Sequence, residues 1–253
     1  MIIFRDDEIM RQYGRRFLLI WLWLIWSWLG HGSPVSAESL RATVLWYQEQ
    51  EAGGDPWQAR YIVTPEFLRS DEGDGSVDFM LLDRRARRIY SVVEETRTVL
   101  EIDGSGELGA SPGDLVIDVR SSRESDAPRL EGHAGRRLEL RAGGDICYSS
   151  VVVDGLLDEA RRAFEEFAHV LAVQQQSLRG NTPEEFITPC FLARYIYAAD
   201  FDSRRGLPVV GWAPDGARRQ LLRYERDVPV DAALFVLPGD YERYQPLIHP
   251  AVK

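Results

Sequence analysis

Lysine is almost absent from this chain: 29 of its 30 basic residues are arginine, and the one lysine is the last residue, Lys253. A lysine at the end of the chain cannot serve in a Schiff base, a P-loop or a Ser-Lys dyad, so these chemistries are excluded. Cysteine and histidine are also scarce, with two and four residues. A four-cysteine zinc site is therefore impossible, and no mixed set of cysteine and histidine has zinc-site spacing. We expect no metal site and no cofactor.

Positive charge is in short supply as well, because 40 acidic residues outweigh the 30 basic ones and give a formal net charge of −10. A nucleic-acid binding protein needs a basic face, so the composition argues against a nucleic-acid partner. The rest of the composition, 45% hydrophobic and 28% charged, is that of an ordinary globular protein.

The amino terminus has the three regions of a secretory signal peptide. Arg11, Arg15 and Arg16 precede a run over residues 17–29 that is apolar except for one serine, and Val35-Ser36-Ala37 is a small-x-small cleavage site. The run is shorter than the roughly 20 residues that cross a bilayer. We therefore predict a signal peptide over residues 1–37, cleavage after Ala37, and a periplasmic protein made of residues 38–253. The alternative is an uncleaved leader that anchors the protein in the inner membrane.

Export gives the two cysteines a structural meaning. Cys147 and Cys190 are the only cysteines, both follow the leader, and exported proteins fold in an oxidising compartment. We therefore predict a Cys147–Cys190 disulfide bond. The alternative is one nucleophilic and one buried cysteine, but the sequence has no CxxC motif and no histidine beside either residue to support it.

Alternating apolar residues predict β-structure over most of residues 41–153. The clearest signal is a three-stranded antiparallel meander over residues 77–82, 88–93 and 98–102, whose strands are joined by short polar turns. Both faces of this meander are partly apolar. One face is therefore expected to be covered by something other than the helix described next.

The apolar period changes after residue 156. Apolar residues recur at steps of three and four from Leu157 to Leu178, with charged residues on the other side, which predicts one amphipathic helix of about 22 residues. Asp154 and Gly155 are placed to cap its start. Short strands are predicted to follow, over residues 191–199, 208–212, 220–225 and 233–237. The pattern predicts an α+β domain over residues 38–253, a mostly antiparallel sheet with this one helix.

Several segments resemble an uncharacterised family of exported proteobacterial proteins, which is similar in turn to LolA- and LolB-like carriers of outer-membrane lipoproteins. The matching segments are residues 63–71 (VTPEFLRSD), 78–84 (DFMLLDR), 88–92 (RIYSV) and 235–241 (FVLPGDY). The resemblance implies a curved antiparallel β-sheet, a LolA-like half-barrel, covered by the long amphipathic helix. It also implies an apolar pocket on the concave side and a lipid or lipoprotein as partner.

Motifs that could support catalysis have better structural explanations. Residues 104–109 match GxGxxG, but no helix is predicted to begin inside the motif, as a phosphate site requires. Glu165 and Glu166 lie beside His169 on the polar side of the helix, where solvated charges are typical. The acidic loop over residues 71–78 lacks the spacing of a calcium-binding loop. We predict no catalytic residue and no enzymatic activity.

The candidate binding residues are therefore apolar. Phe164, Phe167 and Leu171 of the helix, with Phe79 and Leu81 of the meander, are predicted to line one concave space between sheet and helix. The leading hypothesis is a non-enzymatic periplasmic protein that binds an acyl chain or lipoprotein in this cavity. The alternative is a structural or interaction module of the cell envelope, with envelope proteins as partners and a core filled by its own side chains.

Overall fold

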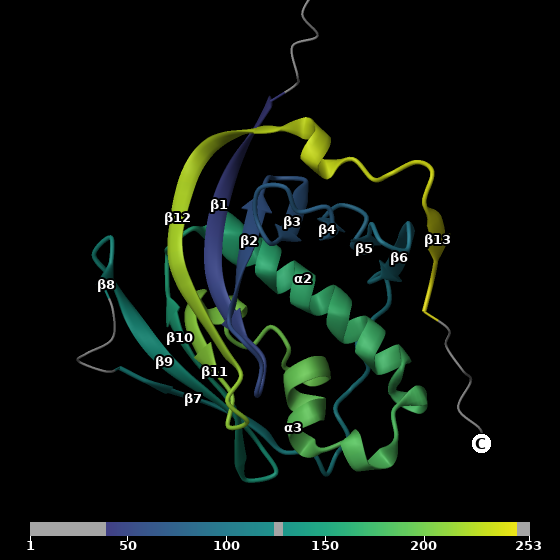
Figure 1. Ribbon diagram of the computed structural model, residues 1–253. Helices are drawn as coiled ribbons and strands as arrows, with labels where there is room; N and C mark the ends of the chain where they lie inside the picture. Colours follow the sequence, from purple (N-terminus) through teal and green to yellow (C-terminus); the bar gives the residue numbers. More distant parts are fainter. Residues whose placement is uncertain (1–38, 124–128, 247–253) are drawn as a thin grey trace, which may run out of the picture. The chain divides into compact units, whose positions relative to one another are not determined.

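The computed structural model describes residues 39–123 and 129–246, which belong to one compact unit beginning at Ser39. The predicted signal peptide and its cleavage site lie outside these ranges. The described residues form a 13-stranded sheet in the order β13-β6-β5-β4-β3-β2-β1-β12-β11-β10-β9-β7, with β8 paired to β9. Helical segments connect some of the strands, and the longest lies across the sheet (Figure 1).

The first six strands lie beside one another in chain order. Each pairs antiparallel with the next, because the connections between them are too short for any other arrangement. The first strand is buried on both faces in its middle, so both faces of the sheet are packed there. The six strands are β1 (Ser39–Gln50), β2 (Trp57–Val63), β3 (Phe67–Asp71), β4 (Phe79–Asp83), β5 (Arg88–Val93) and β6 (Thr98–Asp103).

The later strands extend the sheet on the other side of β1. The long strand β12 runs beside β1 over most of its length, and β11, β10, β9 and β7 follow outward, all antiparallel (Figure 1). These strands are β7 (Ile117–Ser122), β8 (Arg129–Leu130), β9 (His133–Ala142), β10 (Asp145–Val153), β11 (Leu207–Trp212), β12 (Arg218–Asp231) and β13 (Glu242–Tyr244).

The helical residues lie mainly between β10 and β11. The helix α2 (Asp158–Ser177) follows Leu157, whose backbone is left-handed with φ 48°. No side chain caps the helix start, and the predicted caps Asp154 and Gly155 lie further upstream. Asp158 and Glu159 in the first turn favour the start through the helix dipole. The other segments are α3 (Pro189–Leu192), the π-helix η3 (Ala193–Tyr197) and the 3-10 turns η1 (Arg179–Asn181), η2 (Glu184–Phe186), η4 (Ser203–Arg205) and η5 (Ala232–Phe235).

The predicted fold class is wrong. We expected an antiparallel half-barrel covered by one long amphipathic helix, whereas the sheet is mixed and its described helices are α2 and the short α3. The last strand, β13, runs parallel to β6 and pairs Glu242 with Thr98. It covers an edge of β6 that would otherwise expose unpaired backbone groups. A strand of three residues has too little alternation to be recognised in a sequence.

Two of the strands predicted near the C-terminus are also wrong. Most of residues 191–199 belong to α3 and η3, because Thr188 caps the helix start and Pro189 occupies its first turn. Residues 233–237 contain η5, whose first turn is closed by the side chain of Asp231 accepting from the N–H of Ala233.

The main core lies between the sheet and α2. Ala160, Ala163, Phe164 and Val170 of the helix pack against buried residues of β1 to β6, β10 and β11. Gly104, just after β6, allows α2 to approach the end of this strand closely. A Cβ atom there would lie 2.5 Å from a methyl group of Val170 and 2.9 Å from its Cα atom.

The second apolar face of the sheet is covered by the C-terminal segment. Phe235 of η5 is buried there and stacks on Phe67 of β3, with ring centroids 5.4 Å apart. Arg69 also binds this segment, because its guanidinium donates a hydrogen bond of 2.7 Å to the carbonyl of Leu234. The part of the chain that covers this face is thus the segment between β12 and β13.

Candidate functional site

Two adjoining cavities lie between the sheet and the helical segment around η3, and the first of them is also lined by α2. The first, of about 230 Å³, is lined mainly by apolar and aromatic residues, whereas most residues that line the second, of about 380 Å³, are charged or polar. Four residues line both: Tyr148, Arg194, Tyr195 and Arg219. We call the two the apolar cavity and the polar cavity, and together the arginine cleft.

The apolar cavity takes its apolar wall from α2. Phe164, Phe167 and Leu171 lie on one side of the helix, at steps of three and four residues, and all three line the cavity. Phe164 is buried, whereas Phe167 and Leu171 are only partly buried. Phe201 and Pro208 complete the apolar lining from the opposite side.

Arg219 of β12 lies at the centre of the cleft inside a cage of aromatic rings. Its guanidinium carbon lies 4.1 Å from the ring centroid of Tyr47 and 5.0 Å from those of Tyr61 and Phe164. Such contacts stabilise a cation by about 0.5–2 kcal/mol each, depending on desolvation. Its side chain is 26% exposed, so the guanidinium remains within reach of a ligand.

The hydrogen-bonding groups of Arg219 are largely unsatisfied. Its Nε lies 3.4 Å from Oε1 of Glu49, but it is buried and makes no hydrogen bond. That carboxylate already accepts a hydrogen bond of 2.6 Å from the Tyr61 hydroxyl. Burial acts to lower the pKa of Arg219, but the facing Tyr61 and Glu49 more than offset it, so the pKa lies above its usual value and the group stays charged.

Arg194 provides a second cation at the cleft. It belongs to the π-helix η3, a rare conformation that occurs frequently at functional sites. Its guanidinium carbon lies 4.6 Å from the ring centroid of Tyr148 and 5.2 Å from that of Tyr195. Within residues 39–123 and 129–246, Arg194 forms no ion pair and donates no side-chain hydrogen bond.

Tyr148 supplies a third donor, and its position depends on a glycine. A Cβ atom at Gly211 would overlap the Tyr148 hydroxyl oxygen, so only glycine leaves the ring its place over β11. Burial raises the pKa of Tyr148 to about 12, and the nearby Asp202 adds to this effect. The hydroxyl is therefore protonated at neutral pH and can donate a hydrogen bond.

Asp202 is the one carboxylate on the wall of the apolar cavity. Its Oδ1 accepts a hydrogen bond of 2.7 Å from the backbone N–H of Ser203. Burial raises the pKa of Asp202, and the opposing attraction of Arg219 does not cancel this effect. The charge of the apolar cavity therefore comes from two guanidiniums and one carboxyl group that resists ionisation.

The structure divides the five predicted binding residues between two faces of the sheet. Phe164, Phe167 and Leu171 share the apolar cavity. Leu81 is buried with the C-terminal segment on the opposite face, and Phe79 packs against that cluster. The expectation that all five line one space is therefore wrong, because Leu82 rather than Leu81 faces α2.

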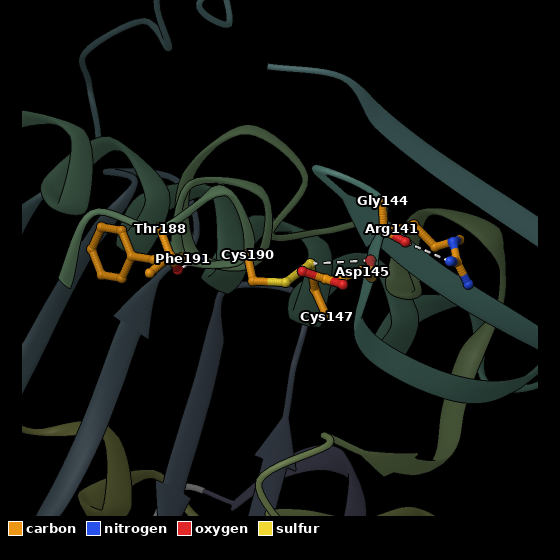
Figure 2. The surroundings of a disulfide bond; sticks show 7 residues. All are labelled: Arg141, Gly144, Asp145, Cys147, Thr188, Cys190 and Phe191. Atoms are coloured by element: carbon orange, nitrogen blue, oxygen red, sulfur yellow. Dashed lines mark hydrogen bonds between the residues drawn. A yellow bond between two sulfur atoms is a disulfide. The ribbon is translucent and has the colours of Figure 1, made fainter. Parts of the chain in front are cut away.

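The disulfide bond between Cys147 of β10 and Cys190 of α3 is confirmed, with Cα atoms 5.0 Å apart (Figure 2). Beside it, the N–H of Phe191 donates to the Thr188 side chain at 3.1 Å, which caps α3 (Figure 2). Because η3 follows α3 without a break, the bond holds the segment that carries Arg194 onto the sheet.

Other polar groups considered in the sequence are engaged in ion pairs. Glu166 accepts from Arg84 at 2.6 Å, and His169 lies along a separate cavity of about 420 Å³ lined mostly by charged side chains. In the acidic loop, Asp71 is bound by Arg60 and by Arg69. Across the described residues, no three side chains of His, Cys, Asp or Glu are grouped as metal ligands.

The sequence did not point to Arg194, Arg219, Tyr148 or Asp202. Their common feature is a place on the cleft wall, and they come from four separate segments between residues 148 and 219. No motif spacing links them. Among the described helices, none combines the length and the apolar character needed to span a membrane.

Comparison with known proteins identifies no family: no family model and no curated protein matches the chain. An uncharacterized conserved protein from Thermus thermophilus is 13% identical, with a TM-score of 0.41 over 81% of this chain and 90% of that one. Two crystal structures of PNGF-II are 6% identical, with TM-scores of 0.38 and 0.39 over 82% of this chain and 31% and 32% of theirs. Likenesses at this level assign neither a fold nor a function.

Proposed function

We propose that the protein binds an acyl chain, free or attached to a lipoprotein, in the apolar cavity and catalyses no reaction. The supporting observation is the row of Phe164, Phe167 and Leu171 along a cavity of about 230 Å³, with the last two only partly buried. Apolar surface left in water costs about 25 cal/mol per Å², so a chain that covers these side chains gains affinity.

The size of the cavity limits the ligand. Pockets for drug-sized molecules typically measure about 300–1,000 Å³, and the apolar cavity lies just below that range. It therefore suits part of one chain rather than several chains together. The resemblance of residues 63–71 and 78–84 to exported proteins similar to lipoprotein carriers supports the same ligand class.

We also propose that the protein acts in the periplasm after removal of residues 1–37. The Cys147–Cys190 bond supports this location, because disulfides persist in oxidising compartments. Intact-mass analysis of protein exported from a bacterial host is expected to give a chain that begins at Glu38. A mass that retains residues 1–37 would contradict cleavage and favour anchoring in the inner membrane.

Binding can be tested with the neutral fluorescent probe N-phenyl-1-naphthylamine. The folded wild type is expected to enhance its fluorescence, and Leu171→Glu is expected to abolish the effect because it places a carboxylate against the apolar wall. The matched control is Leu222→Glu, since Leu222 is 48% exposed and lines neither cavity. Circular dichroism of each variant establishes that it is folded.

A second variant tests the same cavity in case Leu171→Glu does not fold. Ala168 also lines the apolar cavity, so Ala168→Trp is expected to fill it and to displace the probe without burying a charge. If the wild type does not bind the probe, or if Ala168→Trp and Leu222→Glu bind it equally well, the proposal fails. That result favours the interaction module of the cell envelope.

A further inference from the structure

Three side chains that carry hydrogen-bond donors face the arginine cleft, and none of them donates to another side chain there. Arg219 and Arg194 each carry five N–H donors and no acceptor, and Tyr148 carries a hydroxyl. Among the described residues, none accepts a side-chain hydrogen bond from any of the three, and Nε of Arg219 is buried. Because buried polar groups are normally hydrogen-bonded, the buried Nε of Arg219 is the donor that most needs an acceptor, while the partly buried Arg194 and Tyr148 can donate to a ligand beside it.

The charge of the apolar cavity is positive, although the whole chain carries −10. Its charged lining consists of Arg194, Arg219 and Asp202. The polar cavity shares both arginines and adds Arg218 and three acids, Glu49, Glu51 and Asp215. The cationic part of the cleft is therefore the apolar cavity, where Arg194 and Arg219 face a single carboxyl group, that of Asp202, whose pKa is raised by burial.

We infer that the ligand is a single-chain carboxylate, with its chain against Phe167 and Leu171 and its head group bound by Arg194 and Arg219. This inference rests on the proposed function and adds the chemistry of the head group. A planar guanidinium matches a carboxylate through two parallel hydrogen bonds, and charge-assisted bonds of this kind are about twice as strong as neutral ones. The Tyr148 hydroxyl donates a further bond.

The charge of the head group distinguishes a carboxylate from other ligands. A carboxylate brings one negative charge and two oxygens that can accept from the two guanidiniums. A phosphate monoester brings about −1.5 to −2 and would place more negative charge near Glu49, which lies 3.4 Å from Arg219. A cationic head group would face two guanidiniums at close range.

The test measures how well four ten-carbon ligands displace N-phenyl-1-naphthylamine at pH 7.5. The ligands are decanoate, 1-decanol, decyl phosphate and decyltrimethylammonium, so the chain is constant and only the head group changes. The affinity obtained from displacement of the probe is expected to be at least about tenfold higher for decanoate than for decanol. Raising the salt concentration is expected to reduce this advantage without changing the affinity for decanol.

The decisive variant is Arg194→Gln, which removes a charge from η3 but leaves its aromatic neighbours. It is expected to weaken decanoate binding about tenfold and to leave probe and decanol binding unchanged. Arg223→Gln is the matched control, because Arg223 lies on the same strand as Arg219, is exposed and lines neither cavity. Its affinity for decanoate is expected to equal that of the wild type.

The two proposals fail in different ways. If decanol binds as tightly as decanoate, or if Arg194→Gln weakens both ligands equally, the carboxylate assignment is overturned while acyl-chain binding stands. Stronger displacement by decyl phosphate or by decyltrimethylammonium overturns it as well. If the probe does not bind to the wild type at all, the proposed function itself fails.

Discussion

Removal of the disulfide bond is expected to destabilise the protein by about 4 kcal/mol. The bond joins residues 43 positions apart, and the chain-entropy relation gives about 4 kcal/mol for a loop of that length at 25 °C. The change to make is the double substitution Cys147→Ala and Cys190→Ala, because alanine adds no buried hydroxyl group. Cys147 is 4% exposed and packs against Leu138 and Leu140, so the loss of its sulfur adds a small cavity cost.

The measurement is equilibrium unfolding in urea, followed by circular dichroism. Three samples are compared: the oxidised wild type, the wild type in excess reductant and the double alanine variant. The second and third are expected to lose similar free energies of unfolding and to show a larger m value, because the uncrosslinked unfolded chain exposes more surface. The variant is also expected to lose part of its preference for decanoate, since α3 and η3 carry Arg194 and are no longer fixed to β10.

The reasoning would be refuted by a loss of less than about 1 kcal/mol in the double variant. That outcome would mean that the loop between the cysteines is already ordered in the unfolded chain, or that strain in the native state cancels the entropy term. A loss confined to the reduced wild type would instead point to an effect of the reductant rather than of the bond.

Three further predictions concern stability. Asp71→Ala is expected to lower the free energy of unfolding in urea by about 3–5 kcal/mol, because the fully buried carboxylate pairs with Arg60 and Arg69. A loss under about 1 kcal/mol would contradict this. Gly104→Ala is expected to cost about 1–3 kcal/mol because its Cβ would press on the backbone of α2, whereas Gly113→Ala, in open space, should change little. Asp202 has a pKa raised above its usual 3.8, so the native state binds its proton more tightly than the unfolded chain, and stability falls as pH rises from about 4 through the raised value. Asp202→Asn should therefore remove this slope and be more stable than the wild type at pH 7; an unchanged pH profile would contradict the assignment.

Local elements could be predicted from the sequence where alternation and turns agree. The strand expected over residues 88–93 is β5 with the same bounds, since polar turns flank it on both sides. The disulfide followed from two cysteines and an export signal. The class of the fold did not follow, because it depends on β13 and α3, which are too short to produce a periodic pattern.

The faces of the meander were assigned incorrectly for a simple geometric reason. Successive residues of a strand point to opposite faces, so the face of β4 relative to β5 depends on the register set by their turn. The turn pairs Leu82 with Ile89 and Leu81 with Tyr90. Leu82 and Ile89 therefore share the face of α2, and Leu81 lies on the other. A register one residue different would have placed Leu81 under the helix, and the sequence does not distinguish the two.

The position of Arg219 depends on a similar offset in the longest strand pair. The register of β1 and β12 shifts between Trp46 and Tyr47, and beyond this bulge Glu49 pairs with Arg219. If the register before the bulge continued, Glu49 would pair with Gln220, and the side chain of Arg219 would point to the opposite face of the sheet. A single extra residue in the ladder thus places the guanidinium inside the aromatic cage rather than outside it. Since β12 has several arginines and both registers bury similar apolar side chains, the pattern of residues alone could not locate the charge at the centre of the cleft.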